Sequence, residues 1–114
     1  MYNEPFIYDG STLENIKAAE DRVNMGVQLL DDVLPGWEND IDLGKLDLFS
    51  CSDCVLGQLY GDYAFGLEQV GLKTGFHHGF QGVSSVKRVQ QTLYEEYKRL
   101  TEMWSEAITQ KIEG

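Results

Sequence analysis

Apolar residues recur at helical spacing along three long segments of this 114-residue chain, and this pattern constrains the fold more than any other feature. The segments cover residues 11–34, 51–70 and 85–112. Each one predicts an amphipathic helix whose apolar stripe is buried against its neighbours. We therefore expect an all-α fold, a small antiparallel bundle of three main helices, in which residues 1–114 form a single domain.

Residues that start or stop helices lie at the boundaries of these segments. Pro35 cannot continue a helix, and Gly71 suits the position directly after one. Ser50 precedes the second segment, where its hydroxyl would accept an unpaired backbone N–H. We expect residues 1–10 to form an ordered N-terminal arm, and the glycine-rich loop at 72–83 to pack on the domain.

The chain is strongly acidic, with 19 acidic against nine basic residues and a net charge of −10. Such a surface repels nucleic acid and anionic lipid, so we expect neither direct nucleic-acid binding nor membrane binding. The charge is either a solubilising surface or a face for a basic protein partner. The sequence has no long apolar run and no signal-peptide pattern, which predicts a cytoplasmic protein with reduced thiols.

The two cysteines lie close together in the sequence, and so do the two histidines. Cys51 and Cys54, with His77 and His78, supply the ligand types of a tetrahedral zinc site. Adjacent histidines tend to point apart, whereas zinc-binding histidines are usually separated by three to five residues. The spacing leaves three interpretations open: a zinc site, a redox pair of thiols at a helix start, or two small buried residues. No other cofactor is predicted.

Four tyrosines of the second and third segments are candidate partner-binding residues, because aromatic side chains often anchor protein–protein contacts. They are Tyr60, Tyr63, Tyr94 and Tyr97. The sequence lacks a nucleophile-elbow pattern and a phosphate-binding glycine loop. We therefore expect a binding protein rather than an enzyme.

Residues 46–63 carry the pattern LDLxxCxxCVLGQLYGDY, which resembles the core of a group of small uncharacterised proteins encoded by bacteriophages of actinobacteria. Residues 100–104 are similar to the C-terminal segment of that group. The resemblance implies a phage setting, in the cytoplasm of a bacterial host, and no particular reaction.

The negative charge, the four candidate tyrosines and the resemblance to phage proteins together predict a small acidic phage-type protein that binds a host or phage protein. One version of this function is inhibition of a nucleic-acid-binding machine. A zinc or thiol protein built on the cysteine pair is one alternative. A structural or assembly role as a homo-oligomer is another, because the first segment has heptad-like spacing.

Overall fold

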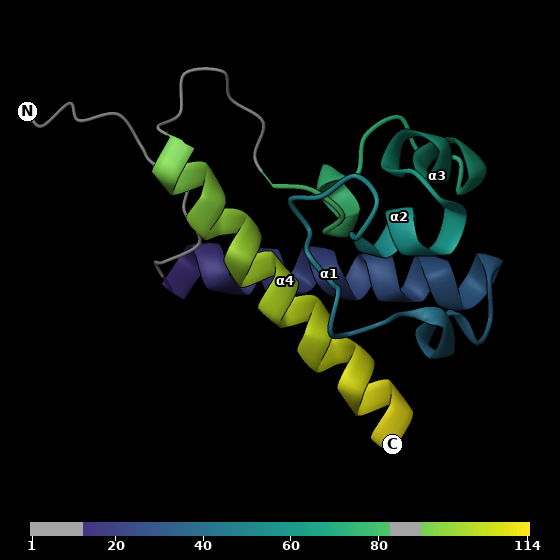
Figure 1. The fold of residues 1–114 in the computed structure, drawn as a ribbon. Coiled ribbons are helices and arrows are strands. Elements are labelled where there is room, and N and C mark those ends of the chain that lie inside the picture. Colours follow the sequence, from purple (N-terminus) through teal and green to yellow (C-terminus); the bar gives the residue numbers. More distant parts are fainter. Residues whose placement is uncertain (1–12, 83–89) are drawn as a thin grey trace, which may run out of the picture.

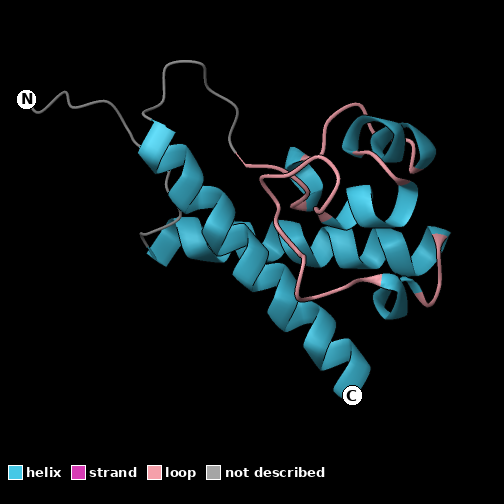
Figure 2. Ribbon diagram, in the orientation of Figure 1, coloured by secondary structure: helices cyan, strands magenta, loops and turns pink. Residues whose placement is uncertain are grey.

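A computed structural model describes residues 13–82 and 90–114 of the chain. These residues fold into helices joined by turns and loops, and they contain no strand (Figure 1 and Figure 2). The all-α fold is therefore confirmed for this part of the chain. The long helices are α1 (Leu13–Val33) and α4 (Gln90–Glu113). The short ones are α2 (Val55–Tyr60), α3 (Tyr63–Gln69) and the 3-10 turns η1 (Trp37–Asp40) and η2 (Phe76–His78).

The prediction of one continuous helix over 51–70 is wrong. Residues 51–54 form a turn, and two short helices follow instead of one. Gly61 ends α2 in the left-handed conformation, with a φ of 94° that favours glycine. Asp62 then caps α3, because its carboxylate accepts the N–H of Phe65 at 3.2 Å. Apolar residues keep their helical spacing across this break, so the sequence pattern did not reveal it.

The two long helices cross obliquely, and both run from left to right in Figure 1. The arrangement differs from the antiparallel bundle of three helices that the sequence predicted. The predicted first helix, 11–34, agrees with α1 over the described residues except at its end, where α1 stops one residue earlier, at Val33. The predicted arm at 1–10 and the predicted start of the last helix at residue 85 lie outside the described residues.

Trp104 of α4 is fully buried at the centre of the fold. Its ring stacks on Phe80 at 5.3 Å between centroids and meets the edge of Trp37 at 5.9 Å. Its indole N–H donates to the carbonyl of Gly79 at 2.7 Å. One side chain thus joins α4 to η1 and to the segment after η2, so these elements share one core.

Gly26 of α1 allows the other elements to approach that helix closely. A Cβ atom at this position would collide with the carbonyl oxygen of His78 and lie 2.8 Å from the ring of Trp104. The sequence predicted a close helix–helix approach here, and Trp104 of α4 provides it. The tight contact of η2 with the same glycine was not predicted.

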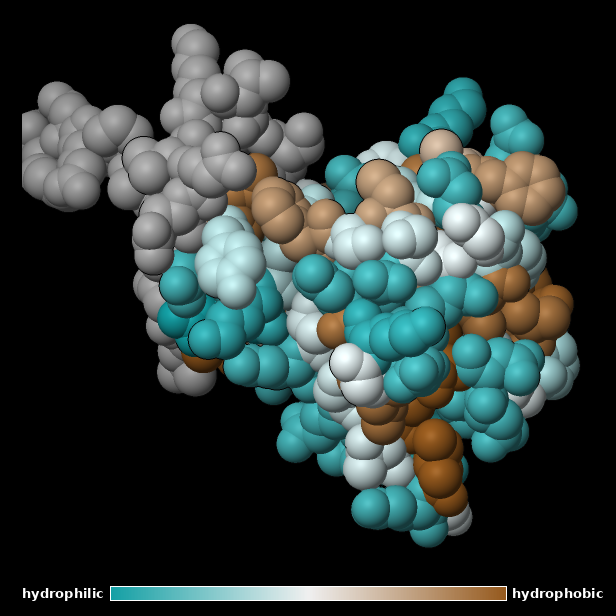
Figure 3. Space-filling view, viewed as in Figure 1, coloured by the Kyte–Doolittle hydropathy of each residue, from teal (hydrophilic) through white to brown (hydrophobic). Residues whose placement is uncertain are grey.

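Figure 3 shows hydrophobic surface in separate patches among hydrophilic side chains, one of them over the last turns of α4. Two exposed apolar side chains belong to the ends of the long helices, Val33 and Ile112. Within the described ranges, no helix combines the length and the apolar character needed to cross a bilayer.

Candidate functional site

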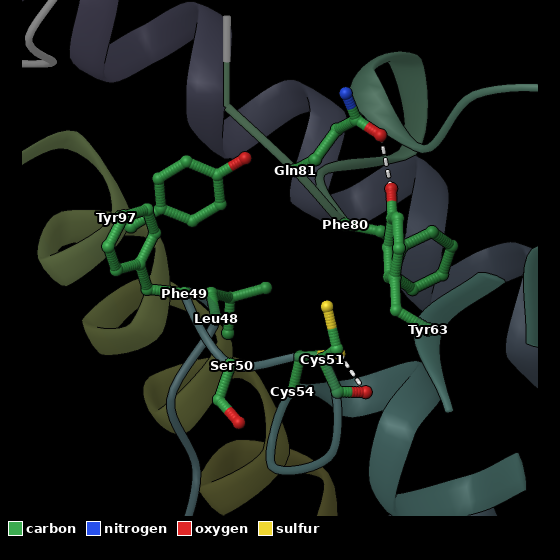
Figure 4. Close-up of a pocket in the computed structure, with 9 residues that line it drawn as sticks. All are labelled: Leu48, Phe49, Ser50, Cys51, Cys54, Tyr63, Phe80, Gln81 and Tyr97. Atoms are coloured by element: carbon green, nitrogen blue, oxygen red, sulfur yellow. Dashed lines mark hydrogen bonds between the residues drawn. The ribbon is translucent and has the colours of Figure 1, made fainter. Parts of the chain in front are cut away.

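A cavity of about 250 Å³ lies between the turn at 48–54, α3, the segment after η2, and α4 (Figure 4). Both cysteines and two of the four candidate tyrosines contribute to it. Nine residues line it: Leu48, Phe49, Ser50, Cys51, Cys54, Tyr63, Phe80, Gln81 and Tyr97. Segments distant in sequence thus meet here, which makes this cavity the candidate site.

Hydrogen bonds hold the turn at 48–54 against α4. The N–H of Leu48 donates to the hydroxyl of Thr101 at 2.9 Å, and that hydroxyl donates to the carbonyl of Tyr97 at 2.9 Å. Within the turn, the Ser50 hydroxyl accepts the N–H of Asp53 at 3.1 Å. Ser50 therefore closes this turn, and does not cap a helix as predicted.

The same turn is also fixed to the short helices. The N–H of Tyr63 donates to the carbonyl of Cys51 at 2.9 Å, which joins the turn to the start of α3. A Cβ atom at Gly57 would collide with that carbonyl and with the backbone of Ser52. The glycine thus lets α2 and the turn lie in direct contact.

The two cysteines have different environments. Cys51 is exposed, and its thiol points into the cavity in Figure 4. Cys54 is buried and caps α2, because its sulfur accepts the N–H of Gly57 at 3.2 Å. Burial raises the pKa of the Cys54 thiol to about 11. This thiol is therefore protonated at neutral pH, which opposes a role as a nucleophile.

The structure does not bring the histidines to the cysteines. His77 is exposed, and His78 lines a different cavity, which it shares with residues of α1 such as Met25 and Asp32. In the part of the chain that the structure describes, no three His, Cys, Asp or Glu side chains are grouped so that they could hold a metal ion. The predicted four-residue zinc site is therefore not assembled among these residues.

The candidate tyrosines fall into two groups. Tyr63 and Tyr97 line the cavity, and Tyr94, which is 53% exposed, lies one turn earlier on α4. Tyr60 lies instead against Gly66, between α2 and α3. The Tyr63 hydroxyl donates to the side-chain oxygen of Gln81, and burial raises the pKa of this phenol.

Phe49 completes the aromatic part of the site, and the sequence did not predict it. Its ring is 5.0 Å from the ring of Tyr97 and 6.5 Å from that of Tyr94, between centroids. We call these three residues the aromatic cluster. Phe49 does not belong to any of the apolar patterns with helical spacing. The one feature of the sequence that could have pointed to it is its position, as an aromatic residue directly before Ser50.

The lining of the cavity offers aromatic rings, hydroxyl groups, an amide and thiols, and none of its nine side chains carries a charge at neutral pH. Such a set is suited to binding and orienting a group. The chain matches no known protein family, no curated protein and no solved structure.

Proposed function

We propose that this chain is a small acidic protein that binds another protein through the aromatic cluster. One observation carries the proposal: two exposed rings, those of Phe49 and Tyr94, lie side by side on a protein of net charge −10. Single exposed apolar residues are common on monomeric proteins, but rings in contact form a larger apolar surface. Aromatic side chains also supply much of the energy of protein–protein contacts.

The charge of the chain supports a basic partner. Attraction between opposite charges accelerates association and selects among partners, whereas buried rings hold the complex together. The resemblance to phage proteins favours a partner in the cytoplasm of a bacterial host or among the proteins of the phage. Proteins that bind nucleic acid have basic surfaces. Binding to a nucleic-acid-binding protein, and inhibition of that protein, is therefore one form of the proposed function.

Capture from a lysate of an actinobacterial host tests the proposal. The full-length chain is immobilised and washed across a salt series, beside the double variant Phe49→Ala/Tyr94→Ala. We expect a partner that is retained at low salt and released as salt rises. Loss of two anchoring rings weakens such contacts by about tenfold or more, so the double variant should retain little of it.

Phe65→Ala is the matched control, because Phe65 is an exposed ring on α3 outside the aromatic cluster. It should retain the partner as the wild-type chain does. If nothing is retained even at low salt, or if the double variant retains as much as the control, the proposed binding surface is wrong.

A further inference from the structure

We propose that the cavity beside the cysteine pair receives the cationic end of a lysine or arginine side chain from the partner. This inference rests on the proposed function and specifies what the site recognises. It goes beyond the aromatic cluster, because the cavity includes residues of α3 and of the segment after η2.

Aromatic rings form opposite sides of the cavity. Figure 4 shows Tyr63 on one side of the space, and Phe49 and Tyr97 on the other. Phe80 also lines it, but its ring is stacked with those of Trp104 and His78, so its faces are occupied. The electron-rich faces of phenylalanine and tyrosine attract an ammonium or guanidinium group held nearby.

The charge of the molecule favours a cation over an anion at this site. None of the nine lining side chains is basic. Lys98 follows Tyr97 on α4 but is exposed and does not line the cavity. The chain as a whole carries a net charge of −10, and this charge attracts a cation.

The cavity is large enough for the end of one side chain. Its volume is about 250 Å³, below the roughly 300–1,000 Å³ typical of sites for small molecules and cofactors. The cavity also adjoins the exposed part of the aromatic cluster, since Phe49 and Tyr97 belong to both. A partner lying on the cluster would thus place a neighbouring side chain at the entrance.

Aromatic NMR spectra of the full-length chain provide the test, with Nα-acetyl-lysine amide as the probe. Nα-acetyl-norleucine amide is the neutral comparison, and ionic strength is kept equal. We expect the lysine probe to shift the ring signals of Tyr63 and Tyr97 in a saturable way. The norleucine probe should bind about fivefold more weakly or worse, because it lacks the cation–π attraction.

Two variants locate the response. Phe49→Leu removes the ring of a residue that is 42% exposed and should weaken binding of the lysine probe by about threefold or more. Phe65→Leu leaves the net charge and the cavity unchanged, and should bind the probe as the wild-type chain does. Thermal melts of both variants verify that the fold is intact.

Equal binding of the two probes would overturn the inference and identify the cavity as an apolar pocket. Absence of any shift at Tyr63 and Tyr97, up to the solubility limit of the lysine probe, would overturn it as well. Neither result affects the capture experiment. A partner that still depends on Phe49 and Tyr94 would preserve the proposed function without this cavity.

Discussion

Cys54 is 2% exposed, and its sulfur accepts the N–H of Gly57, so this thiol takes the place of a polar N-cap side chain on α2. Cys51 is exposed and lines the cavity. Two cysteines separated by two residues thus differ in burial and in chemistry. At the residue scale, the surroundings of each thiol decide its role, and the spacing of the pair does not.

This difference predicts unequal reactivity with a disulfide reagent such as dithionitrobenzoate. The pKa of the Cys54 thiol is about 11, so only about one such thiol in a thousand is ionised at pH 8. We expect Cys51 to react quickly in the native protein and Cys54 to react only on unfolding. Cys51→Ser should remove the fast phase, and Cys54→Ser should preserve it. Fast reaction of both thiols in the folded chain would contradict this assignment.

At the scale of elements, the break between α2 and α3 shapes the site. Gly61 ends one helix and Asp62 begins the next, so the chain changes direction before Tyr63. This change places Tyr63 where its N–H reaches the carbonyl of Cys51 and its hydroxyl reaches Gln81. In one straight helix, residue 63 would lie more than two turns beyond residue 54, far from the turn that holds the cysteines.

Asp62→Ala should destabilise the protein by about 1 kcal/mol, because α3 loses its N-cap hydrogen bond. Urea denaturation monitored by circular dichroism measures the change. Asp62→Asn is the matched control, since asparagine caps a helix about as well as aspartate. If Asn were as destabilising as Ala, the negative charge of Asp62 rather than its hydrogen bond would be the stabilising feature.

At the scale of the whole molecule, two contacts close the fold. Trp104 joins α4 to the loop after η2 and to η1 through the core. On the surface, the carboxylate of Asp31 at the end of α1 accepts the indole N–H of Trp37 at 2.9 Å and pairs with Lys111 at 2.9 Å. The far ends of α1 and α4 are thereby tied to each other and to η1.

This tie predicts a weakening of the fold in acid. Partial burial alone would raise the pKa of Asp31, but the hydrogen bond from Trp37 and the nearby Lys111 ammonium lower it overall. A group whose pKa is lower in the folded state than in the unfolded state stabilises the fold at pH values above its unfolded-state pKa. That stability is lost as pH falls through the folded-state pKa. The contribution is present above about pH 4 and disappears below it.

Asp31→Asn tests this directly. Solvent screens this half-exposed pair, so we expect the variant to be about 0.5–1 kcal/mol less stable than wild type at pH 7. The difference in unfolding free energy should shrink below pH 4. Asp32→Asn removes the same charge from an exposed neighbour outside this tie and should show a smaller loss. Equal losses in the two variants would indicate a general charge effect.

The sequence by itself determined the helical class of the described residues and nearly all of α1, because apolar spacing and Pro35 are local signals. It did not reveal the break at Gly61, since the apolar stripe runs on across it. The Ser50 hydroxyl accepts a backbone N–H, as predicted, but it closes a turn rather than capping a helix.

Only the tertiary structure decided how the candidate residues group. Tyr97 is 46 residues after Cys51, yet both line one cavity, whereas the histidines lie elsewhere. Phe49 joined the site through contacts with α4 that no local pattern encodes. Helical periodicity reports which face of a segment is buried. Which segments meet depends on close approaches between distant residues, such as the packing of Trp104 and η2 against Gly26.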